Sequence, residues 1–592
     1  MQNYKAPLRD MRFLTHEVFS APIAAAGGNG EALAPDLIDS ILEEAGRFVE
    51  EKLLPLNASG DEEGCHYENG VVRTPKGFKE AYDLFREGGW TALACDLDYG
   101  GQGLPERVNK LVEEMICSAN LSFGLYPGLS RGAYQALRDH GSEELKRRFL
   151  PKLAAGVWSG TMCLTEAHCG TDLGMLRTRA VPQADGSYAL SGSKIFISAG
   201  EHDLTENIIH LVLARLPDAP SGTKGISLFL VPKFLPDEQD RPGARNGVLC
   251  TAIEHKMGIK ASATCQLTFE NAKGWLVGAP HRGLAAMFTM MNSERLSVGI
   301  QGLAIAEAAY QSAVAYARER IQGRSLSGAK NPNQPADPII VHPDVRRMLL
   351  TMRAYAEGCR ALGLWVADAL DAVERGEGEK AEDFAALMTP VVKALFTDFG
   401  FEAANLAVQV YGGHGYIRDH GVEQYVRDAR IAMIYEGTNG IQALDLVGRK
   451  LGAHYGRLLR GFFHPVAAFI GAHKEDAAIG KMVHALEKAF GALQLATAHI
   501  AEAGMRDPEE AGAAASEYLR LFGLVALGFM WARMAKTAAT KLADGAEESS
   551  FYHAKLATAR FYMERILPQA GALYLAIKSG KHAMMALAEA AF

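Results

Sequence analysis

I-Y-E-G-T-N-G-I-Q, residues 434–442, places one carboxylate between an apolar run and a glycine-spaced turn that leads into a helix. The apolar residues before Glu436 are expected to exclude water, which raises the pKa of a carboxyl group towards neutrality. A carboxylate with such a pKa suits a general base, and the glycines let the backbone approach a ligand closely. The same residues fit equally well a helix N-terminal acid for which Gly437 and Thr438 form the cap.

Three further blocks precede this stretch. They are M-C-L-T-E with G-T-D (162–166, 170–172), K-I-F-I-S (194–198), and Q-V-Y-G-G-H-G-Y with R-D-A-R (409–416, 427–430). In this order the four blocks resemble the motifs of the acyl-CoA dehydrogenase family. One block alone carries little weight, but four in the right order over roughly residues 160–450 make chance a poor explanation.

The resemblance implies an FAD-dependent enzyme that converts an acyl-CoA thioester into a trans-2-enoyl-CoA. Glu436 would abstract the α-proton, and N5 of the flavin would accept the β-hydride, which is chemistry that no side chain supplies. The family holds the thioester carbonyl with the backbone N–H of Glu436 and a ribityl hydroxyl of FAD. Electron-transfer flavoprotein is the implied electron acceptor. An acyl-CoA oxidase on the same scaffold and a catalytically silent scaffold protein are the alternatives.

Flavin contacts are carried over position by position from the first two blocks. Phe196 and Ser198 stand where the family has Trp and Thr, so an aromatic face and a hydroxyl are kept. From the residues alone, Phe196 also fits a core aromatic on a buried strand. The expected flavin contacts are Met162, Leu164, Thr165, Thr171, Phe196 and Ser198.

The adenosine side of FAD is implied to come from a neighbouring subunit, which makes the protein a homodimer or a larger homo-oligomer. R-E-R-I-Q-G (318–323) resembles a motif whose arginine binds the FAD pyrophosphate, so Arg320 is the candidate. Arg324 is the alternative, because the family's aromatic is missing and a loop follows. Gln409, Gly412 and Gly413 would complete this side, although the two glycines also fit a turn that ends a helix.

The substrate-binding candidates surround the expected base. Arg295 stands where the family has an arginine near the CoA pantetheine, but a surface salt bridge with Glu294 is an equal alternative. The substrate candidates are Thr171, Arg295, Tyr435 and Gly437, and Thr438 is a further cofactor candidate. The two ends of the chain resemble a longer bacterial branch of the family, which indicates a short thioether or a straight-chain acyl group.

The composition is that of a folded globular protein. Hydrophobic residues make up 48% and charged residues 22% of the 592 residues, which argues against disorder. The net charge of −8 argues against a nucleic-acid or anionic-membrane partner. Eight cysteines without a C-x-x-C pair indicate reduced thiols, and the start of the chain shows no secretion segment, so we expect a cytoplasmic protein. The histidines lack metal-ligand spacing, so no metal site is predicted.

The hydrophobic periodicity changes along the chain and predicts a mainly α fold with a central, barrel-like β domain. Residues 325–343, rich in Pro, Asn and Gly, are expected to be a loop between two helices. His464-Pro465 is expected near the last boundary. The predicted units are an extension (1–35, loose at 24–30), a helical domain (36–157), the β domain (158–278), a helical catalytic domain (279–460) and an additional C-terminal helical domain (461–592).

Overall fold

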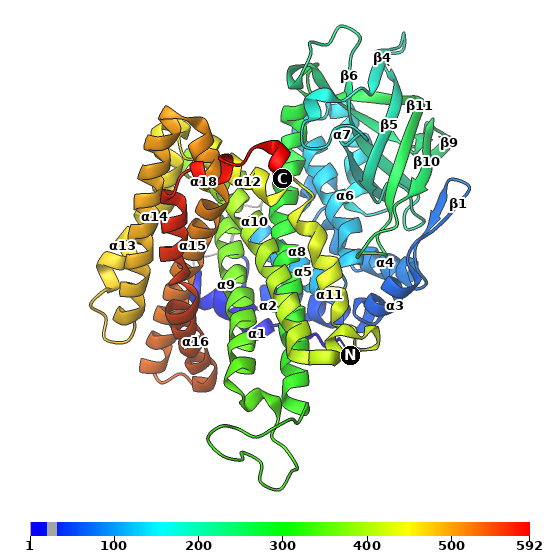
Figure 1. Cartoon of the computed structure of the whole chain (residues 1–592). Helices are drawn as coiled ribbons and strands as arrows, with labels where there is room; N and C mark the ends of the chain where they lie inside the picture. The colour runs from blue at the N-terminus through cyan, green and yellow to red at the C-terminus, as the bar shows by residue number, and fades with distance from the viewer. Residues whose placement is uncertain (1, 21–31) are drawn as a thin grey trace.

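The computed structural model describes residues 2–20 and 32–592 and is mainly helical with one central β domain (Figure 1). In this view the β domain lies at the upper right, long helices form the centre, and the last helices of the chain lie at the left. The predicted fold class is therefore confirmed. The loose patch expected at 24–30 lies outside the described residues.

The chain begins with a short helical segment, α1 (Leu8–Arg12), which continues as π-helical turns over Phe13–Val18. Met11, Phe13 and Leu14 are fully buried, so this extension is part of the hydrophobic core. The N-terminal helical domain follows with α2 (Pro35–Phe48), α3 (Pro55–Glu63), α4 (Phe78–Glu87), α5 (Glu106–Ala119), α6 (Leu121–His140) and α7 (Glu143–Ala154).

A hairpin that the helical spacing did not predict interrupts these helices. It consists of β1 (His66–Glu68) and β2 (Val71–Arg73). Its turn is Asn69-Gly70, with positive φ angles of 49° and 82°. Asn-Gly is a strong signal for a two-residue hairpin turn, because both residues tolerate this conformation.

The β domain contains a closed ring of strands. β11 pairs with β5 and β7, β7 pairs with β6, and β4 connects β5 to β6, so five strands form the ring and β3 and β10 extend it. The strands are β3 (Trp158–Cys163), β4 (Arg179–Pro182), β5 (Tyr188–Ser198), β6 (Asn207–Arg215), β7 (Ile226–Pro232), β8 (Phe234–Pro236), β9 (Pro242–Arg245), β10 (Val248–Ile253) and β11 (Thr264–Val277).

Long helices form the next domain, and their close packing depends on glycine. A Cβ atom on Gly302 of α8 would lie 2.4 Å from the carbonyl oxygen of Phe396 on α10, so only a glycine allows this approach. The loop expected between two helices connects α8 to α9 and projects from the lower end of the molecule in Figure 1. The helices are α8 (Gly283–Glu319), α9 (Pro343–Glu374), α10 (Glu379–Tyr411), α11 (Glu423–Ala429) and α12 (Asn439–Asp445).

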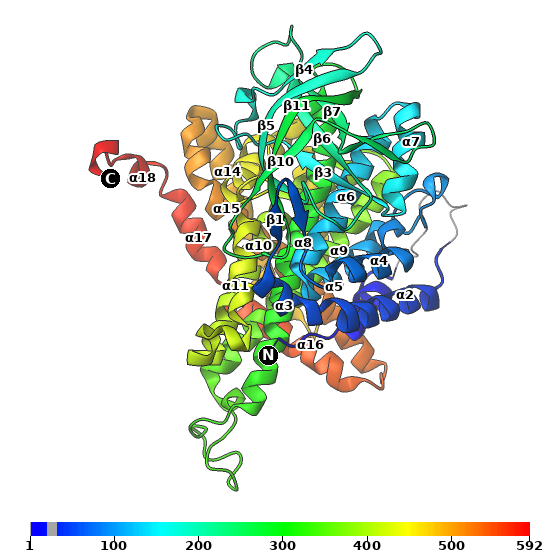
Figure 2. The same ribbon diagram turned by 90° about the vertical axis from the view of Figure 1, so that its right-hand side faces the viewer.

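The additional C-terminal helices pack against α9, α10 and α12. They lie on the side of the molecule away from the β domain in Figure 1, and α14 and α15 therefore lie behind it in Figure 2. They are α13 (Arg457–His473), α14 (Gly480–Arg506), α15 (Pro508–Ala543), α16 (Ser549–Phe561), α17 (Gln569–Lys578) and α18 (His582–Met585). By length and composition, α15 and the segment Glu379–Tyr416 would be able to cross a membrane. In each, 78% of the apolar window is buried inside the protein, as in a core helix.

Pro465 lies inside α13, and this helix spans the expected division between 460 and 461. Pro465 is exposed and the residue four positions earlier is Gly461, so the freed carbonyl lies at the helix surface and the proline is tolerated. The backbone instead breaks at His454 and Tyr455, whose φ angles are 47° and 56°.

A buried cluster of charges joins the chain start to the later helices. The guanidinium of Arg360 on α9 forms ion pairs with Asp10, Glu114 on α5 and Glu307 on α8. Lys555 on α16 forms a further ion pair with Asp10. All five side chains are at least nine-tenths buried, so each charge depends on these partners for compensation.

Candidate active site

The loop before α12 presents Glu436 in a strained conformation. Glu436 has a φ of 56° and Gly437 a φ of 83°, and the left-handed region is costly for a residue with a side chain. The hydroxyl of Thr438 accepts a hydrogen bond from the N–H of Ile441 at 3.3 Å, so the predicted helix cap is confirmed. Gln442 donates its amide to the carbonyls of Glu436 and Gly437, at 3.1 and 3.3 Å. The loop is thus held from several sides.

The side chain of Glu436 is half-buried, and one of its two carboxylate oxygens is fully enclosed. Its Oε2 atom is buried and has no hydrogen-bond partner among the described residues. Burial raises the pKa of Glu436 to about 7, although Arg295 and Lys393 oppose the shift. Glu294 on α8 is buried as well, and its pKa is raised to about 8 by burial and by the charge of Glu436. Near neutral pH, a negative charge on either of these two carboxyl groups therefore disfavours ionisation of the other.

Arg295 is the nearest described cation on α8, and it is not a surface residue. It is 8% exposed and forms no ion pair within the described part of the chain. The surface salt bridge considered for it with Glu294 is therefore wrong. Its Nε has no hydrogen-bond partner there, and its guanidinium lies 5.9 Å from the ring centroid of Phe288. Arg295 thus supplies a buried positive charge that Asp445 and, to a lesser extent, Glu436 partly compensate.

Lys393 on α10 is a site residue that the motifs did not indicate. It is fully buried, and its Nζ donates to the carbonyl of Gly437 at 2.7 Å and to Oδ1 of Asn439 at 2.9 Å. Burial lowers the pKa of Lys393 to about 7, and the charge of Glu436 opposes this shift. A single lysine within the apolar run of residues 390–396 was the available sequence signal.

The two flavin blocks are joined by one ion pair. Lys194, from the second block, donates to the carbonyl of Leu164 and to Oε1 of Glu166, both at 2.9 Å. Glu166 also accepts hydrogen bonds from the backbone and hydroxyl of Thr178. The loop that carries Leu164, Thr165 and Thr171, and that follows Met162 at the end of β3, is therefore fixed against strand β5, which carries Phe196 and Ser198.

Phe196 occupies a β-bulge and points to solvent. Lys194 pairs with Leu267 and Ile197 pairs with Cys265, so residues 195 and 196 face only one residue of β11. Phe196 has a φ of 58°, and its side chain is 60% exposed. The interpretation as a core aromatic is therefore wrong. An exposed ring held in a strained backbone is a feature that clusters at functional sites.

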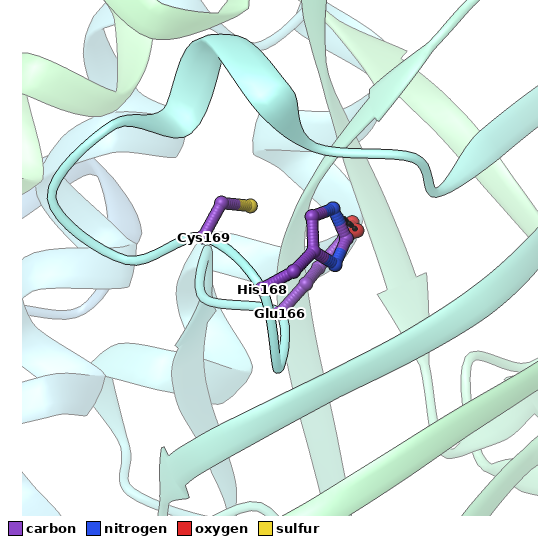
Figure 3. A group of neighbouring side chains, drawn as sticks. All are labelled: Glu166, His168 and Cys169. Atoms are coloured by element: carbon purple, nitrogen blue, oxygen red, sulfur yellow. Dashed lines mark ion pairs between the residues drawn. The ribbon is translucent and has the colours of Figure 1, made fainter.

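Glu166 also belongs to a group with His168 and Cys169 whose ligand atoms lie within 4.8 Å of one another (Figure 3). The three side chains come from the loop between β3 and β4. Lys194 and the Thr178 hydroxyl occupy the carboxylate of Glu166, and together they outweigh burial and lower its pKa to about 2. The group is explained by its role in fixing this loop.

The residues expected on the adenosine side lie far from Glu436 of the same chain. Arg295 and Arg320 are separated by 25 residues of helix α8, which corresponds to about 37 Å. Arg320 is exposed, whereas Arg324 forms an ion pair with the buried Asp337. Gln409 is exposed in the last turn of α10. The predicted glycine turn that ends this helix is confirmed.

Gly412 begins this turn with a φ of 60°, and a Cβ atom on Gly412 or Gly413 would meet nothing within 4 Å. The backbone here is open to a ligand from outside the chain.

The R-D-A-R block is structural in this chain. Arg427 forms ion pairs with Asp61 on α3, at 2.6 Å, and with Glu423. Asp428 accepts the N–H of Ile259 at 2.5 Å. These contacts join the N-terminal domain, the β domain and α11, directly before the loop that carries Glu436. The block thus sets the position of the loop rather than contributing to its chemistry.

Four family models match the chain in consecutive segments. The acyl-CoA dehydrogenase N-terminal domain matches residues 37–157, the middle domain 161–272, and the C-terminal domain 281–451. A model described as acetyl-CoA dehydrogenase C-terminal like matches residues 462–588.

Two relatives match over nearly their whole length. The 3-methylmercaptopropionyl-CoA dehydrogenase of Ruegeria pomeroyi is 45% identical over 573 residues, which are 96% of this chain and 97% of the relative. The broad-specificity linear acyl-CoA dehydrogenase FadE5 of Mycobacterium tuberculosis is 36% identical over 100% of both chains. The crystal structure of an acyl-CoA dehydrogenase complexed with FAD from Bacillus anthracis superposes with a TM-score of 0.75 at 19% identity, over 97% of this chain and 92% of that one. This superposition shows a shared fold.

Proposed function

The chain belongs to the acyl-CoA dehydrogenase family of FAD-dependent oxidoreductases, and from this premise we propose that Glu436 is the general base for the α-proton of the thioester. The observation that carries the proposal is the buried, unpartnered Oε2 of Glu436 in a strained and firmly held loop. A base with a pKa of about 7 can both take and hold a proton near neutral pH.

The described residues fit the flavin cofactor. Phe196 offers an exposed aromatic face, and Lys194 and Glu166 fix the loop and the strand on either side of it. We propose that Met162, Leu164, Thr165, Thr171, Phe196, Ser198 and Thr438 contact FAD. When bound, FAD supplies the acceptor for the β-hydrogen, which leaves as a hydride.

The chain's own groups do the rest of the chemistry. In the described part of the chain, the N–H of Glu436 has no hydrogen-bond acceptor, so it is available to the thioester carbonyl as negative charge develops there. Arg295 and Lys393 favour the ionised form of Glu436, so the carboxylate is ready to accept the proton. Tyr435, whose hydroxyl donates to Gln301, and Gly437 complete the proposed substrate side with Thr171.

The proposal is tested by Glu436→Gln, which keeps the shape of the side chain but cannot accept a proton. Turnover should fall by roughly 10² or more while FAD stays bound, as measured by steady-state kinetics and flavin absorbance. Glu294→Gln is the matched control. With a pKa of about 8, Glu294 is largely protonated at pH 7, and an amide replaces it with little change in charge. Retained turnover in Glu436→Gln would exclude this role.

We further propose a short acyl thioester as the substrate, with 3-methylmercaptopropionyl-CoA as the first candidate. The support is 45% identity to a relative of that name over nearly the whole chain. A straight-chain acyl group is the second candidate, because the relative named for linear acyl groups is 36% identical. A panel of acyl-CoA thioesters, scored by bleaching of the flavin absorbance, separates the two.

For partners we propose electron-transfer flavoprotein as the electron acceptor, a homodimer or larger homo-oligomer, and a cytoplasmic location. The support for shared subunits is the distance along α8 between Arg295 and Arg320. Arg320→Ala should release FAD and weaken subunit association together, as measured by flavin content and by light scattering. Arg324→Ala is the control, since Arg324 is engaged with Asp337; a flavin-loaded dimer of Arg320→Ala would contradict the proposal. Measured oxygen consumption distinguishes an oxidase.

A further inference from the structure

Lys393 occupies an unusual place for a lysine. It lies in α10 between Val391, Val392, Ala394 and Leu395, which are all buried, and it is fully buried itself. A cation in such surroundings usually has an ion-pair partner. Within the described residues, Lys393 forms none.

The ammonium group of Lys393 is used to hold the base loop. Its Nζ lies 2.7 Å from the carbonyl oxygen of Gly437, the residue after Glu436, and 2.9 Å from Oδ1 of Asn439. Because Gly437 follows the base directly, this contact restricts rotation of the backbone that carries the carboxylate.

Asn439 is oriented by α10 as well. Its Nδ2 donates to the hydroxyl of Thr397 at 3.1 Å and to Oδ1 of Asp398 at 2.7 Å. These bonds direct Oδ1 of Asn439 towards Lys393. Residues 393–398 of α10 thus form hydrogen bonds with both the base loop and the first residue of α12.

Charges face Glu436 from three elements. Arg295 and Glu294 come from α8, Lys393 comes from α10, and Tyr435 precedes the base in its own loop. Lys393 in turn faces Glu436, Arg295 and, within α10, Asp398. The charges of Lys393 and Glu436 stabilise each other, because Lys393 is buried, Glu436 is half-buried, and each charge lowers the cost of ionising the other.

We propose that Lys393 is a positioning residue that fixes the peptide after Glu436 and favours the ionised form of this carboxylate. The inference rests on the proposed role of Glu436 as the base. Lys393 acts through the loop, because its ammonium group is hydrogen-bonded to Gly437 and Asn439.

Three variants separate the effect of the hydrogen bonds that hold the loop from the effect of the positive charge of Lys393. Lys393→Met removes both the hydrogen bonds and the charge, Lys393→Arg keeps the charge, and Asn439→Ala keeps the ammonium but removes one partner. Two measurements apply to each FAD-loaded variant. The first is the pH dependence of single-turnover flavin bleaching, and the second is an infrared titration of the Glu436 carboxyl band, assigned by its loss in Glu436→Gln.

Lys393→Met should move the acid limb of bleaching, and the infrared pKa, upwards by about one pH unit, because a facing cation is lost. Its rate at high pH should fall by about tenfold, because the loop loses its anchor. Lys393→Arg and Asn439→Ala should keep the wild-type acid limb and lower only the rate. Lys256→Met is the matched control, since Lys256 holds a backbone carbonyl, that of Ser262 at 2.7 Å, on a turn of the β domain.

An unchanged acid limb and an unchanged rate in Lys393→Met would overturn the inference. If this variant loses FAD, Lys393→Arg and Asn439→Ala decide by the same criteria, and a shifted acid limb in both would equally overturn it. The result for Glu436→Gln is independent, because retained bleaching there would exclude the base and not merely its support.

Discussion

Two regions of the protein contain buried charges. In one region these charges form ion pairs, and in the other they form none among the described residues. In the cluster around Arg360, each carboxylate lies against a cation, and Lys555 and Arg360 outweigh burial and hold the pKa of Asp10 below its usual value. Around Glu436, neither the carboxylate nor the guanidinium of Arg295 forms an ion pair with another described residue, and burial is the largest influence on both pKa values.

This difference in pairing indicates that the first group of charges stabilises the fold and that the second takes part in the reaction. Paired buried charges join elements that are far apart in sequence, and removing one leaves the others uncompensated. Unpaired buried charges are costly to the fold, but they are free to take part in a proton transfer. Changing the same residue type in the two regions should therefore have opposite effects on stability.

The largest effect is expected from Arg360→Ala. Three buried carboxylates would lose their shared cation, so the free energy of unfolding should fall by about 3–5 kcal/mol. Denaturant unfolding measures this. A loss below about 1 kcal/mol would show that the cluster is solvated, and the comparison between the regions would fail.

Arg295→Met should lower turnover without lowering the free energy of unfolding. The free energy of unfolding should stay unchanged or rise, because an unpaired buried cation is replaced by an apolar side chain. Turnover at pH 7 should fall by about tenfold, since losing the cation raises the pKa of Glu436 and fewer base groups are ionised. Thermal unfolding and a pH–rate profile test both halves, and a large loss of stability with normal turnover would refute them.

An effect that is small at pH 5 and grows with pH is expected from Glu294→Gln. The folded-state pKa of about 8 lies above the usual value of 4.5, so this carboxyl stabilises the fold fully below pH 4.5 and loses that contribution as the pH rises through 8. The glutamine cannot ionise, so the variant should gain melting temperature relative to wild type at pH 9 but not at pH 5. Equal differences at both pH values would argue against a raised pKa.

The motifs predicted only those site residues that stand within a recognisable run of sequence. Glu436 and the two flavin blocks were predicted as site residues because each lies within a short run of residues that resembles a family motif. Lys393 was missed because its partner Gly437 is 44 residues away, and only the packing of α10 brings them together.

Other differences have local causes. The Asn69-Gly70 signal for a hairpin was present, but the surrounding helical spacing outweighed it. Arg324 forms an ion pair with Asp337, 13 residues further along the chain, and the motif alone did not predict this contact. Pro465 fits within helix α13 because it lies on the exposed face of that helix. The hydrophobic periodicity of the sequence alone did not show which face is exposed.

The ion pair between Asp10 and Lys555 also constrains when the protein can finish folding. The two residues are 545 positions apart, so Asp10 leaves the ribosome long before its partner is made. At synthesis rates of 5–20 residues per second, the delay is roughly 30–110 s. Arg360 follows Asp10 by 350 residues, so it is available to Asp10 only in the later part of this interval, and Lys555 is made later still. The final docking of the start of the chain must therefore follow translation of α16, when nearly the whole protein has been synthesised.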